Sequence, residues 1–260
     1  MIVVSADGSH RLQQVGLTLW RGRFENHDFL WFATTDLNAT ATTWPILHNY
    51  ALTYAICQYS HAAYRGYRPN YDADLDRMNG YALPTQNTAA GTTRFTQNAI
   101  DEITQRTEKI VGSNGRFKDA KFNTPKLGQR VSLTPVMTVP GGGSGGFEVY
   151  FFGWNNFRPP TVFRLGKKGC PIRVWWEEVK DATAVMDDAA FSPLHPVNPR
   201  DLLGEPDSLV SYYPAFLPPH LLYTRATLRK EWRIRLSAGR CIHVPARVVR
   251  RWQAGSLGSG

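Results

Sequence analysis

The first clear pattern along the chain is an alternation of apolar and polar side chains over residues 15–24. Val15, Leu17 and Leu19 fall on one side of an extended chain, and Thr18 and Trp20 fall on the other. This alternation predicts a strand. Residues 29–33 are also apolar and follow a polar stretch at 25–28, so we predict a second strand there, paired with the first as a hairpin.

The pattern changes to a helical period in residues 42–63, TTWPILHNYALTYAICQYSHAA. Apolar side chains recur there three and four positions apart, in one stripe of Ile46, Tyr50, Tyr54 and Cys57. Thr43 is a suitable N-cap and Pro45 suits a first turn, which predicts that the helix begins near residue 43. Since only a narrow polar stripe remains, we expect the helix to be buried against a sheet.

Beyond this helix the chain returns mostly to strand patterns. Strands are expected at 80–83, 131–139, 147–153, 161–165, 172–179 and 244–249, with renewed alternation over 221–237. Residues 185–219 are rich in proline, which predicts irregular structure with one short helix at 199–203. This order of elements predicts an α+β fold dominated by antiparallel sheet.

Residues 85–130 differ from their surroundings because they are polar, basic and poor in large apolar side chains. We interpret them as an insertion into a single domain, with a short helix near 96–109 followed by a mobile basic segment. The cations proposed to bind nucleic acid there are Arg116, Lys118, Lys121 and Lys126. Residues 181–260 are taken as a β-rich C-terminal extension, and the final GSLGSG, residues 255–260, as a linker remnant.

Composition adds a basic charge balance to this picture. The 260 residues carry 30 Lys and Arg against 21 Asp and Glu, a formal net charge of +9. This excess favours polyanionic partners, chiefly nucleic acid, although solvated surface charge accounts for it equally well. The three cysteines form no CxxC pair, and no apolar run approaches the ~18 residues that a membrane span needs. We therefore expect a cytoplasmic protein without membrane contact.

The sequence offers little support for a metal site or a catalytic site. Two Cys–His pairs, at positions 57 and 61 and at 241 and 243, each lack a second half at metal-ligand spacing. Asp72, Asp74 and Asp76 lack the glycine and the closing glutamate of a calcium loop, so we interpret them as a solvated loop. We expect neither a cofactor nor a catalytic residue.

The strongest candidate for nucleic-acid contact is the stretch FRLGKKGCPIRV, residues 163–174. Gly166 and Gly169 permit a tight turn between two strands, and the lysines between them project as mobile cations. The candidate cations of this stretch are Arg164, Lys167, Lys168 and Arg173. Such groups bind RNA phosphates. A hairpin whose lysines serve only solubility remains an open alternative on these residues alone.

Four stretches together resemble a known family: LHNYALTYA, YRPNYDADL, NTPKLGQRVSLTP and FRLGKKGCPIRV. In this order they are similar to the Csc-one subunit of type I-D CRISPR Cascade, a member of the Cas-five group of the RAMP superfamily. The resemblance covers roughly residues 15–180, and the rest is matched only loosely, through HPVNPRDL.

The resemblance implies a modified ferredoxin-like (RRM-like) RAMP fold with an inserted thumb, for which residues 85–130 are the candidate. It implies a non-catalytic subunit that caps the five-prime, repeat-derived handle of the crRNA. It also implies contacts with a Cas-seven-type backbone subunit and with the large subunit, and a position near the protospacer-adjacent motif of target double-stranded DNA.

Carried over residue by residue, the family's RLGKK stretch corresponds to residues 164–168 of this chain, and its helix motif supplies His48 and Asn49 as further candidates for RNA contact. Tyr50 and Tyr54 of that motif follow the apolar stripe, which favours a structural role for it. Two rival functions stay open. One is a metal-independent endonuclease acting on CRISPR repeat RNA, although no His, Tyr and Lys set can be assembled for it; the other is a protein–protein adaptor.

Overall fold

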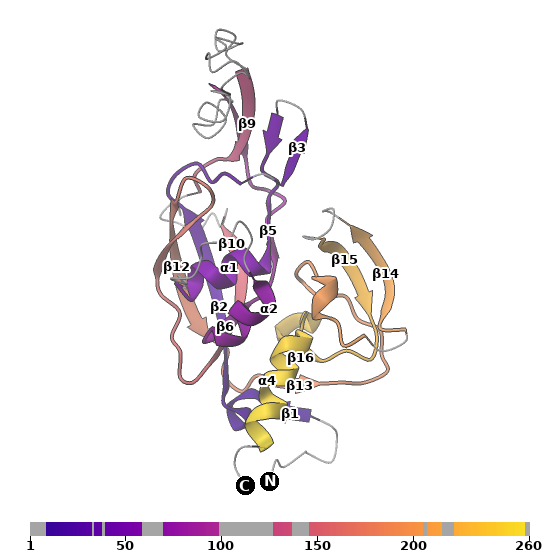
Figure 1. The fold of residues 1–260 in the computed structure, drawn as a ribbon. Helices are drawn as coiled ribbons and strands as arrows, with labels where there is room; N and C mark the ends of the chain where they lie inside the picture. Colours follow the sequence, from indigo (N-terminus) through magenta and orange to yellow (C-terminus); the bar gives the residue numbers. More distant parts are fainter. Residues whose placement is uncertain are drawn as a thin grey trace, which may run out of the picture.

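The computed structural model describes residues 9–32, 34–37, 40–58, 70–98, 127–136, 146–204, 207–214 and 221–257. Over these residues the protein belongs to the α+β class and is built mostly of antiparallel sheet, as the sequence predicts (Figure 1). Among the described strand pairs, only one runs parallel. None of the described helices is long and apolar enough to cross a membrane.

The centre of the protein is a five-stranded antiparallel sheet. Its strands, in spatial order, are β11 (Val162–Leu165), β12 (Cys170–Glu178), β2 (Leu17–Asn26), β10 (Phe147–Trp154) and β6 (Gly80–Ala82). These strands confirm the sequence predictions at 15–24, 80–83, 147–153, 161–165 and 172–179 within a few residues. The predicted pairing of 15–24 with 29–33 is wrong, because β10 and β12 occupy both edges of β2. Of the described residues 29–32, Leu30 alone makes a β-bridge, to Leu133, and residue 33 lies outside the described residues.

The central strand β10 is buried on both of its faces. Phe147, Val149 and Phe151 point to the inner face of the sheet, where they pack with Leu52 and Ile56 of helix α1 (Asn49–Ile56). The alternate residues point to the outer face, where a second core includes Tyr150, Phe152 and Trp154. Because both faces are covered at this strand, its sequence is almost continuously apolar.

Helix α1 begins at Asn49, so its N-cap, His48, lies five residues after the predicted cap at Thr43. The side chain of Thr43 is not free to cap it, because its hydroxyl accepts from the backbone N–H of Phe32 and donates to the Phe32 carbonyl. Residues 46 and 47 form strand β5 (Ile46–Leu47), paired with β7 (Thr85–Gln86), and His48 is the N-cap. Residues 59–63 of the predicted helix lie outside the described residues. The aspartates predicted to lie in a loop are helical, in α2 (Tyr71–Arg77), whose N-cap is Asn70.

A long hairpin of β8 (Thr92–Asn98) and β9 (Leu127–Leu133) projects from the body of the protein (Figure 1). Strand β4 (Thr40–Thr42) pairs in parallel with β9, and β3 (Thr35–Leu37) pairs with β4. The helix predicted at 96–109 is wrong for residues 96–98, which continue β8. Residues 99–126 lie outside the described residues, and with them the candidates Arg116, Lys118, Lys121 and Lys126.

The C-terminal part covers one end of the outer face. Its sheet has four antiparallel strands. Three belong to the C-terminal part, namely β13 (Thr183–Val185), β16 (Arg233–Arg235) and β17 (Cys241–His243), and the fourth is the N-terminal strand β1 (Ser9–Arg11), which pairs with β13. Helix α4 (Ala246–Leu257) follows, and its Val248, Val249 and Trp252 join the outer core. The strand predicted at 244–249 is therefore wrong. Residues 255–257, set aside as part of a linker, belong to this helix.

Strands β14 (Leu209–Pro214) and β15 (Tyr223–Leu228) form a separate hairpin beside this sheet, although irregular structure was predicted for the first of them. The short helix predicted at 199–203 is confirmed as the 3-10 helix η2 (Pro199–Asp201), capped by Asn198. Two further 3-10 helices are η1 (Leu12–Val15) and η3 (Ser237–Gly239).

Candidate nucleic-acid interface

The turn between β11 and β12 is held in one conformation by its two glycines. Gly166 and Gly169 have φ angles of 78° and 63°, in the left-handed region that favours glycine. A side chain at Gly166 would lie 2.6 Å from the carbonyl oxygen of Trp31, so this position accepts no Cβ without a shift of backbone. The backbone N–H of Lys167 donates to that same carbonyl at 2.8 Å, which fastens the turn to the segment before it. The side chains of Lys167 and Lys168 are exposed.

Beside the turn, four segments of the chain bring aromatic rings and cations together. We name this group the Trp31 cluster; its members are Phe29, Trp31, Phe95, Arg130 and Lys167. The Lys167 Nζ lies 5.1 Å from the centre of the Trp31 ring, and the Arg130 guanidinium lies 5.2 Å from the same ring centre. Arg130 is also 4.7 Å from the Phe95 ring, which contacts Phe29 edge-to-face. Cation–π contacts of this kind hold long basic side chains in place.

Two polar atoms of this cluster are buried without a partner among the described residues. They are the indole Nε1 of Trp31 and the Nε of Arg130. Both are donors, so the cluster combines positive charge and aromatic faces with N–H groups that have no acceptor in the described residues. Because these two N–H groups are buried, it is the charge and the aromatic faces of the cluster that complement the phosphates and bases of a single-stranded nucleic acid.

The sequence identified Lys167 in this cluster but missed Phe29, Trp31 and Phe95. It interpreted residues 29–33 as a strand, and it counted Arg130 only among the basic residues of the insertion. The available signal was the run FLWF, residues 29–32, which is more aromatic than a half-buried strand requires.

The other candidates of the turn are not all brought together with Lys167. Arg164 and Arg173 are exposed on the outer face of the sheet, since their neighbours Phe163, Leu165, Ile172 and Val174 all point inward. The Arg164 guanidinium donates to the carbonyl of Gly169 at 2.8 Å, which ties it to the turn. Arg173 lies further along β12, with its guanidinium 5.5 Å from the Trp175 ring.

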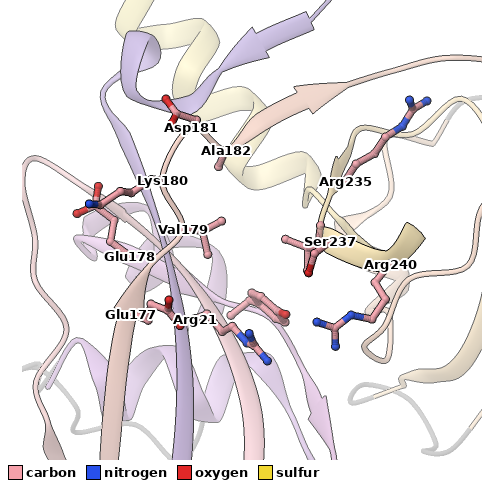
Figure 2. A pocket seen from close by; sticks show the side chains of 12 residues that line it. Arg21, Glu177, Glu178, Val179, Lys180, Asp181, Ala182, Arg235, Ser237 and Arg240 are labelled. Atoms are coloured by element: carbon pink, nitrogen blue, oxygen red, sulfur yellow. The ribbon is translucent and has the colours of Figure 1, made fainter.

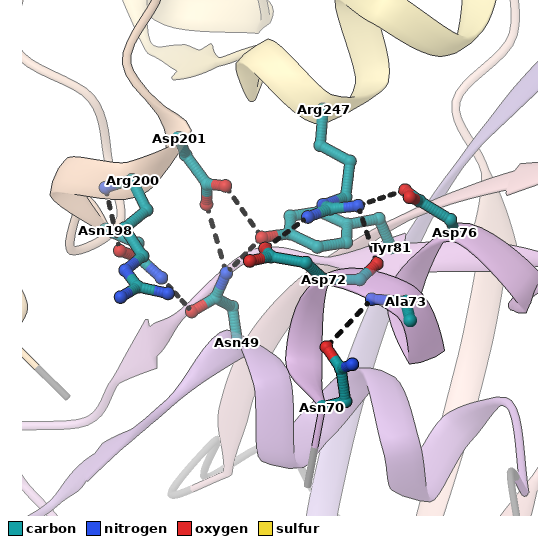
Figure 3. Close-up of polar contacts among 10 residues, drawn as sticks. All are labelled: Asn49, Asn70, Asp72, Ala73, Asp76, Tyr81, Asn198, Arg200, Asp201 and Arg247. Atoms are coloured by element: carbon teal, nitrogen blue, oxygen red, sulfur yellow. Dashed lines mark hydrogen bonds and ion pairs between the residues drawn. The ribbon is translucent and has the colours of Figure 1, made fainter. Parts of the chain in front are cut away.

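Of the two helix-motif candidates, His48 is half-buried and Asn49 lies inside the protein. His48 is the N-cap of α1, and its Nδ1 accepts from the backbone N–H of Tyr50 at 3.2 Å. Asn49 is completely buried. Its amide donates to the Tyr81 hydroxyl at 2.7 Å and to the Asp201 carboxylate at 3.0 Å (Figure 3). Its carbonyl oxygen accepts from Asn198 at 3.1 Å, so Asn49 joins α1 to η2 and is not accessible to a nucleic acid.

This buried network also changes the ionisation of its members. Burial raises the pKa of Asp201 to about 6, although the hydrogen bond from the Tyr81 hydroxyl and nearby positive charges oppose that rise. Burial and the neighbouring Asp201 raise the pKa of Tyr81 well above its usual value. The network therefore has a structural role, and its only group that titrates near neutral pH is a carboxyl closed off from solvent.

The acidic stretch at 72–76 has a structural partner as well. Asp72 and Asp76 both pair with the guanidinium of Arg247 on α4, as Figure 3 shows. Two carboxylates of α2 thus fasten the C-terminal helix to the body. In the described ranges, no group of three or more His, Cys, Asp and Glu side chains is placed to hold a metal ion.

A cleft of about 630 Å³ separates the outer face from the C-terminal part (Figure 2). Its lining includes the cations Arg21, Lys180, Arg235 and Arg240 and the acidic residues Glu177, Glu178 and Asp181. Two of these cations are already paired, Arg21 with Glu148 and Arg235 with Asp187. Since its charges nearly balance, the cleft is a poorer site for a polyanion than the Trp31 cluster.

Comparison with protein families gives one match. The sequence model of the family described as type I-D CRISPR-associated protein Cas5/Csc1 matches residues 17–251. Comparison with curated proteins gives no match. The matched residues include all five strands of the central sheet, the β8–β9 hairpin and nearly all of the C-terminal part.

Proposed function

The chain belongs to the family of type I-D CRISPR-associated proteins Cas5/Csc1, and on this premise we propose that it is a non-catalytic Cascade subunit that caps the five-prime handle of the crRNA. In this proposal the protein acts in the cytoplasm by holding a single-stranded RNA end. Phosphates are held by Lys and Arg, and bases stack on aromatic rings.

The observation that carries the proposal is the Trp31 cluster with its adjoining turn. Lys167 and Lys168 project from a turn that backbone contacts fix in place, and Lys167 and Arg130 both contact the Trp31 ring. A pre-formed arrangement of this kind binds with little loss of side-chain entropy, since the cations are already held near their positions. Because these groups meet from three distant parts of the chain, their proximity is a property of the fold.

The topology supports the proposed ferredoxin-like RAMP fold. Strand β2 leads through α1 and α2 to β6, and β10 lies between the two, which is the arrangement of a split βαβ unit. Strand β12 lies on the other side of β2, so four strands follow the order β12-β2-β10-β6. The connection from β10 to β12 runs through β11 in place of a second helix. In this proposal the β8–β9 hairpin is the stem of the inserted thumb.

The proposed protein partners are a Cas-seven-type backbone subunit and the large subunit, with target double-stranded DNA near the protospacer-adjacent motif. Strand β14 supports a protein contact, because it exposes Val210, Tyr212 and Tyr213. The two tyrosines also line a cleft of about 730 Å³. Exposed apolar groups gathered in this way are typical of protein interaction sites.

The test is RNA binding by two double variants that change the net charge equally. Lys167→Ala with Lys168→Ala removes the cations of the turn, and Lys180→Ala with Lys230→Ala removes two exposed lysines elsewhere. Binding of a labelled repeat-derived RNA is followed by fluorescence anisotropy over a range of salt concentrations. We expect only the first variant to bind more weakly and to lower the salt slope, by about 1.4 for two lost phosphate contacts on a single strand. Equal losses in both variants, or none, contradict the proposed site.

The absence of catalysis is a separate part of the proposal and has its own test. The purified protein is incubated with repeat RNA in the presence of EDTA, and the products are separated on a denaturing gel. We expect intact RNA. Cleavage at a defined position favours the rival function, a metal-independent endonuclease.

A further inference from the structure

The outer face of the central sheet is covered by the C-terminal part at one end only. At that end Leu17, Leu19, Phe152 and Trp154 are buried in the outer core. Along the same face toward the β11–β12 turn, the side chains become accessible: Trp175 is 43% exposed and Val162 is 56% exposed. The indole of Trp175 is therefore an aromatic surface that a ligand can reach.

Strand register places cations on two sides of this indole, and the acidic Glu177 follows it on the same face. Trp175 lies directly opposite Arg23 of β2, and Arg173 lies two residues before it on the same face. The Arg173 guanidinium is 5.5 Å from the centre of the Trp175 ring, in a cation–π contact. Arg164 occupies the edge strand on this face, between Arg173 and the turn.

The two arginines beside Trp175 are not ion-paired, although a carboxylate lies opposite each of them in the strand register. Glu148, opposite Arg23 in the register, is engaged by Arg21 and by the Tyr150 hydroxyl. Glu25, opposite Arg173, is buried. Within the described part of the chain, neither Arg23 nor Arg173 forms an ion pair with a carboxylate, and both are exposed. The acidic residues Glu177 and Glu178 begin only at the far end of β12, beside the charge-balanced cleft of Figure 2.

We propose that Trp175 is a stacking platform for one base of the single-stranded RNA held at the turn, and that Arg23 and Arg173 bind the phosphates beside that base. This inference rests on the proposed RNA-binding function and extends it to the opposite face of the sheet. Aromatic rings on an open sheet face, flanked by cations, are a recurrent mode of single-strand recognition.

The two sites are close enough for one strand of RNA. Trp175 is five residues from Cys170 at the end of the turn, or roughly 17 Å along the strand. That distance corresponds to about five nucleotides at the ~3.4 Å spacing of a stacked strand, and to fewer when the strand is extended. Arg164 bridges the path, because it lies on the outer face while its guanidinium contacts the Gly169 carbonyl of the turn. The RNA path ends at Trp175, where the acidic end of β12 begins.

The experiment uses the full chain and a short single-stranded RNA that carries the fluorescent base 2-aminopurine at one position at a time. We expect strong quenching at one position, or at two adjacent ones, on binding to the wild-type protein. Trp175→Leu removes this quenching and weakens binding roughly 5- to 150-fold, the range for loss of one stacked base. Trp175→Phe retains part of both effects. Tyr213→Leu is the control, since it removes another exposed aromatic ring elsewhere, 71% exposed against 43% for Trp175, and we expect it to leave the quenching unchanged.

Further outcomes separate this inference from the proposed function. If the Lys167→Ala and Lys168→Ala double variant weakens binding while Trp175→Leu changes neither affinity nor quenching, the platform is overturned and the turn site stands. If Trp175→Leu weakens binding and the lysine variant does not, the platform stands and the turn site is overturned. Quenching with single-stranded DNA but not with RNA also overturns the inference.

A second variant guards against misfolding of Trp175→Leu. Arg23→Gln with Arg173→Gln leaves the indole in place and removes the two flanking cations. We expect it to lower the salt slope of RNA binding by about 1.4 while the quenched position stays the same. An unchanged slope contradicts the assigned role of the arginines. Thermal denaturation of each variant verifies that it is folded.

Discussion

Lys167 contacts Trp31 in two ways: its backbone N–H donates to the Trp31 carbonyl at 2.8 Å, and its Nζ lies 5.1 Å from the centre of the Trp31 ring. The conformation of the turn and the position of its cation are therefore coupled. A change that lifts the turn from residue 31 also moves the ammonium group away from the ring. This coupling makes the turn testable by substitutions that leave its charge untouched.

Gly166→Ala tests this coupling. Gly166 and Gly204 have similar left-handed φ angles of 78° and 80°, so alanine at either position costs about 1–2 kcal/mol of backbone strain. A Cβ at Gly204 meets nothing within 4 Å, whereas one at Gly166 lies 2.6 Å from the Trp31 carbonyl oxygen. We expect Gly166→Ala to lose more stability than Gly204→Ala in urea denaturation, and to be the only one of the two that weakens RNA binding. Equal effects would show that the contact with Trp31 is unimportant.

Trp31→Leu separates stacking from charge at the proposed site. The substitution removes the ring that Lys167 and Arg130 approach but leaves both charges in place. We expect weaker RNA binding by about 1–3 kcal/mol, the range for loss of one stacked base, with little change in the salt slope. Anisotropy titrations at several salt concentrations measure both quantities. A fall in the slope as large as that of the lysine double variant would mean that Trp31 acts only by positioning the cations.

The central strands were predictable because their patterns are local. Residues 15–24 and 172–179 alternate along most of their length, and the Gly-Lys-Lys-Gly turn is a strong signal for a hairpin. Where apolar runs are short, the pattern is ambiguous between strand and helix. Residues 244–249 show this: a strand is predicted there, but Pro245 precedes a helix whose buried side includes Val248, Val249 and Trp252.

The candidate site was less predictable because long-range contacts assemble it. The segment around Trp31 meets Phe95 and Arg130 only because Leu30 bridges Leu133 and β8 pairs with β9. Hydrophobic periodicity does not predict which distant segments will pair in this way. The same holds for Asn49, whose position in a helix motif gave no sign that its partners would be Tyr81 and Asp201, the latter more than 150 residues away.

Asn49→Ala tests the structural role that its burial indicates. The side chain makes three hydrogen bonds, and its loss leaves the Asp201 carboxylate and the Asn198 amide each short of a buried partner. An unsatisfied buried polar group costs about 1–3 kcal/mol, so we expect a loss of about 3 kcal/mol or more in the free energy of unfolding.

Asn70→Ala is the control for this loss. Asn70 is an exposed cap of α2 that accepts one hydrogen bond, from the N–H of Ala73 at 3.3 Å, and removal of such a cap costs about 1 kcal/mol. Urea denaturation of both variants gives the comparison. Equal losses would argue that the buried network contributes no more than a surface cap. Folded Asn49→Ala protein should bind RNA as the wild type does.

The pH dependence of stability offers a direct test of Asp201. Burial raises its pKa to about 6 in the folded protein, against 3.8 for a carboxyl in the unfolded chain. Between these two pH values the folded state binds more protons than the unfolded state, so stability falls as pH rises from about 4 to about 6 and is then level. The shift of about two pKa units corresponds to about 3 kcal/mol.

Asp201→Asn removes this titration. The quantity to compare is the difference in free energy of unfolding between the wild type and this variant at each pH. His195 contributes the opposite slope in both, because burial lowers its pKa to about 3 and stability is lost as pH falls below about 6.5. The free energy of unfolding is measured by urea denaturation at several pH values. We expect the wild-type value minus the variant value to fall by about 3 kcal/mol from pH 4 to pH 6. The variant also differs from the wild type by an amount of stability that does not depend on pH, because it presents an amide nitrogen to the donor of Asn49. The test is therefore how the difference in free energy of unfolding changes with pH. If the free energy of unfolding has the same pH dependence in both proteins, Asp201 has an ordinary pKa and is accessible to water in solution.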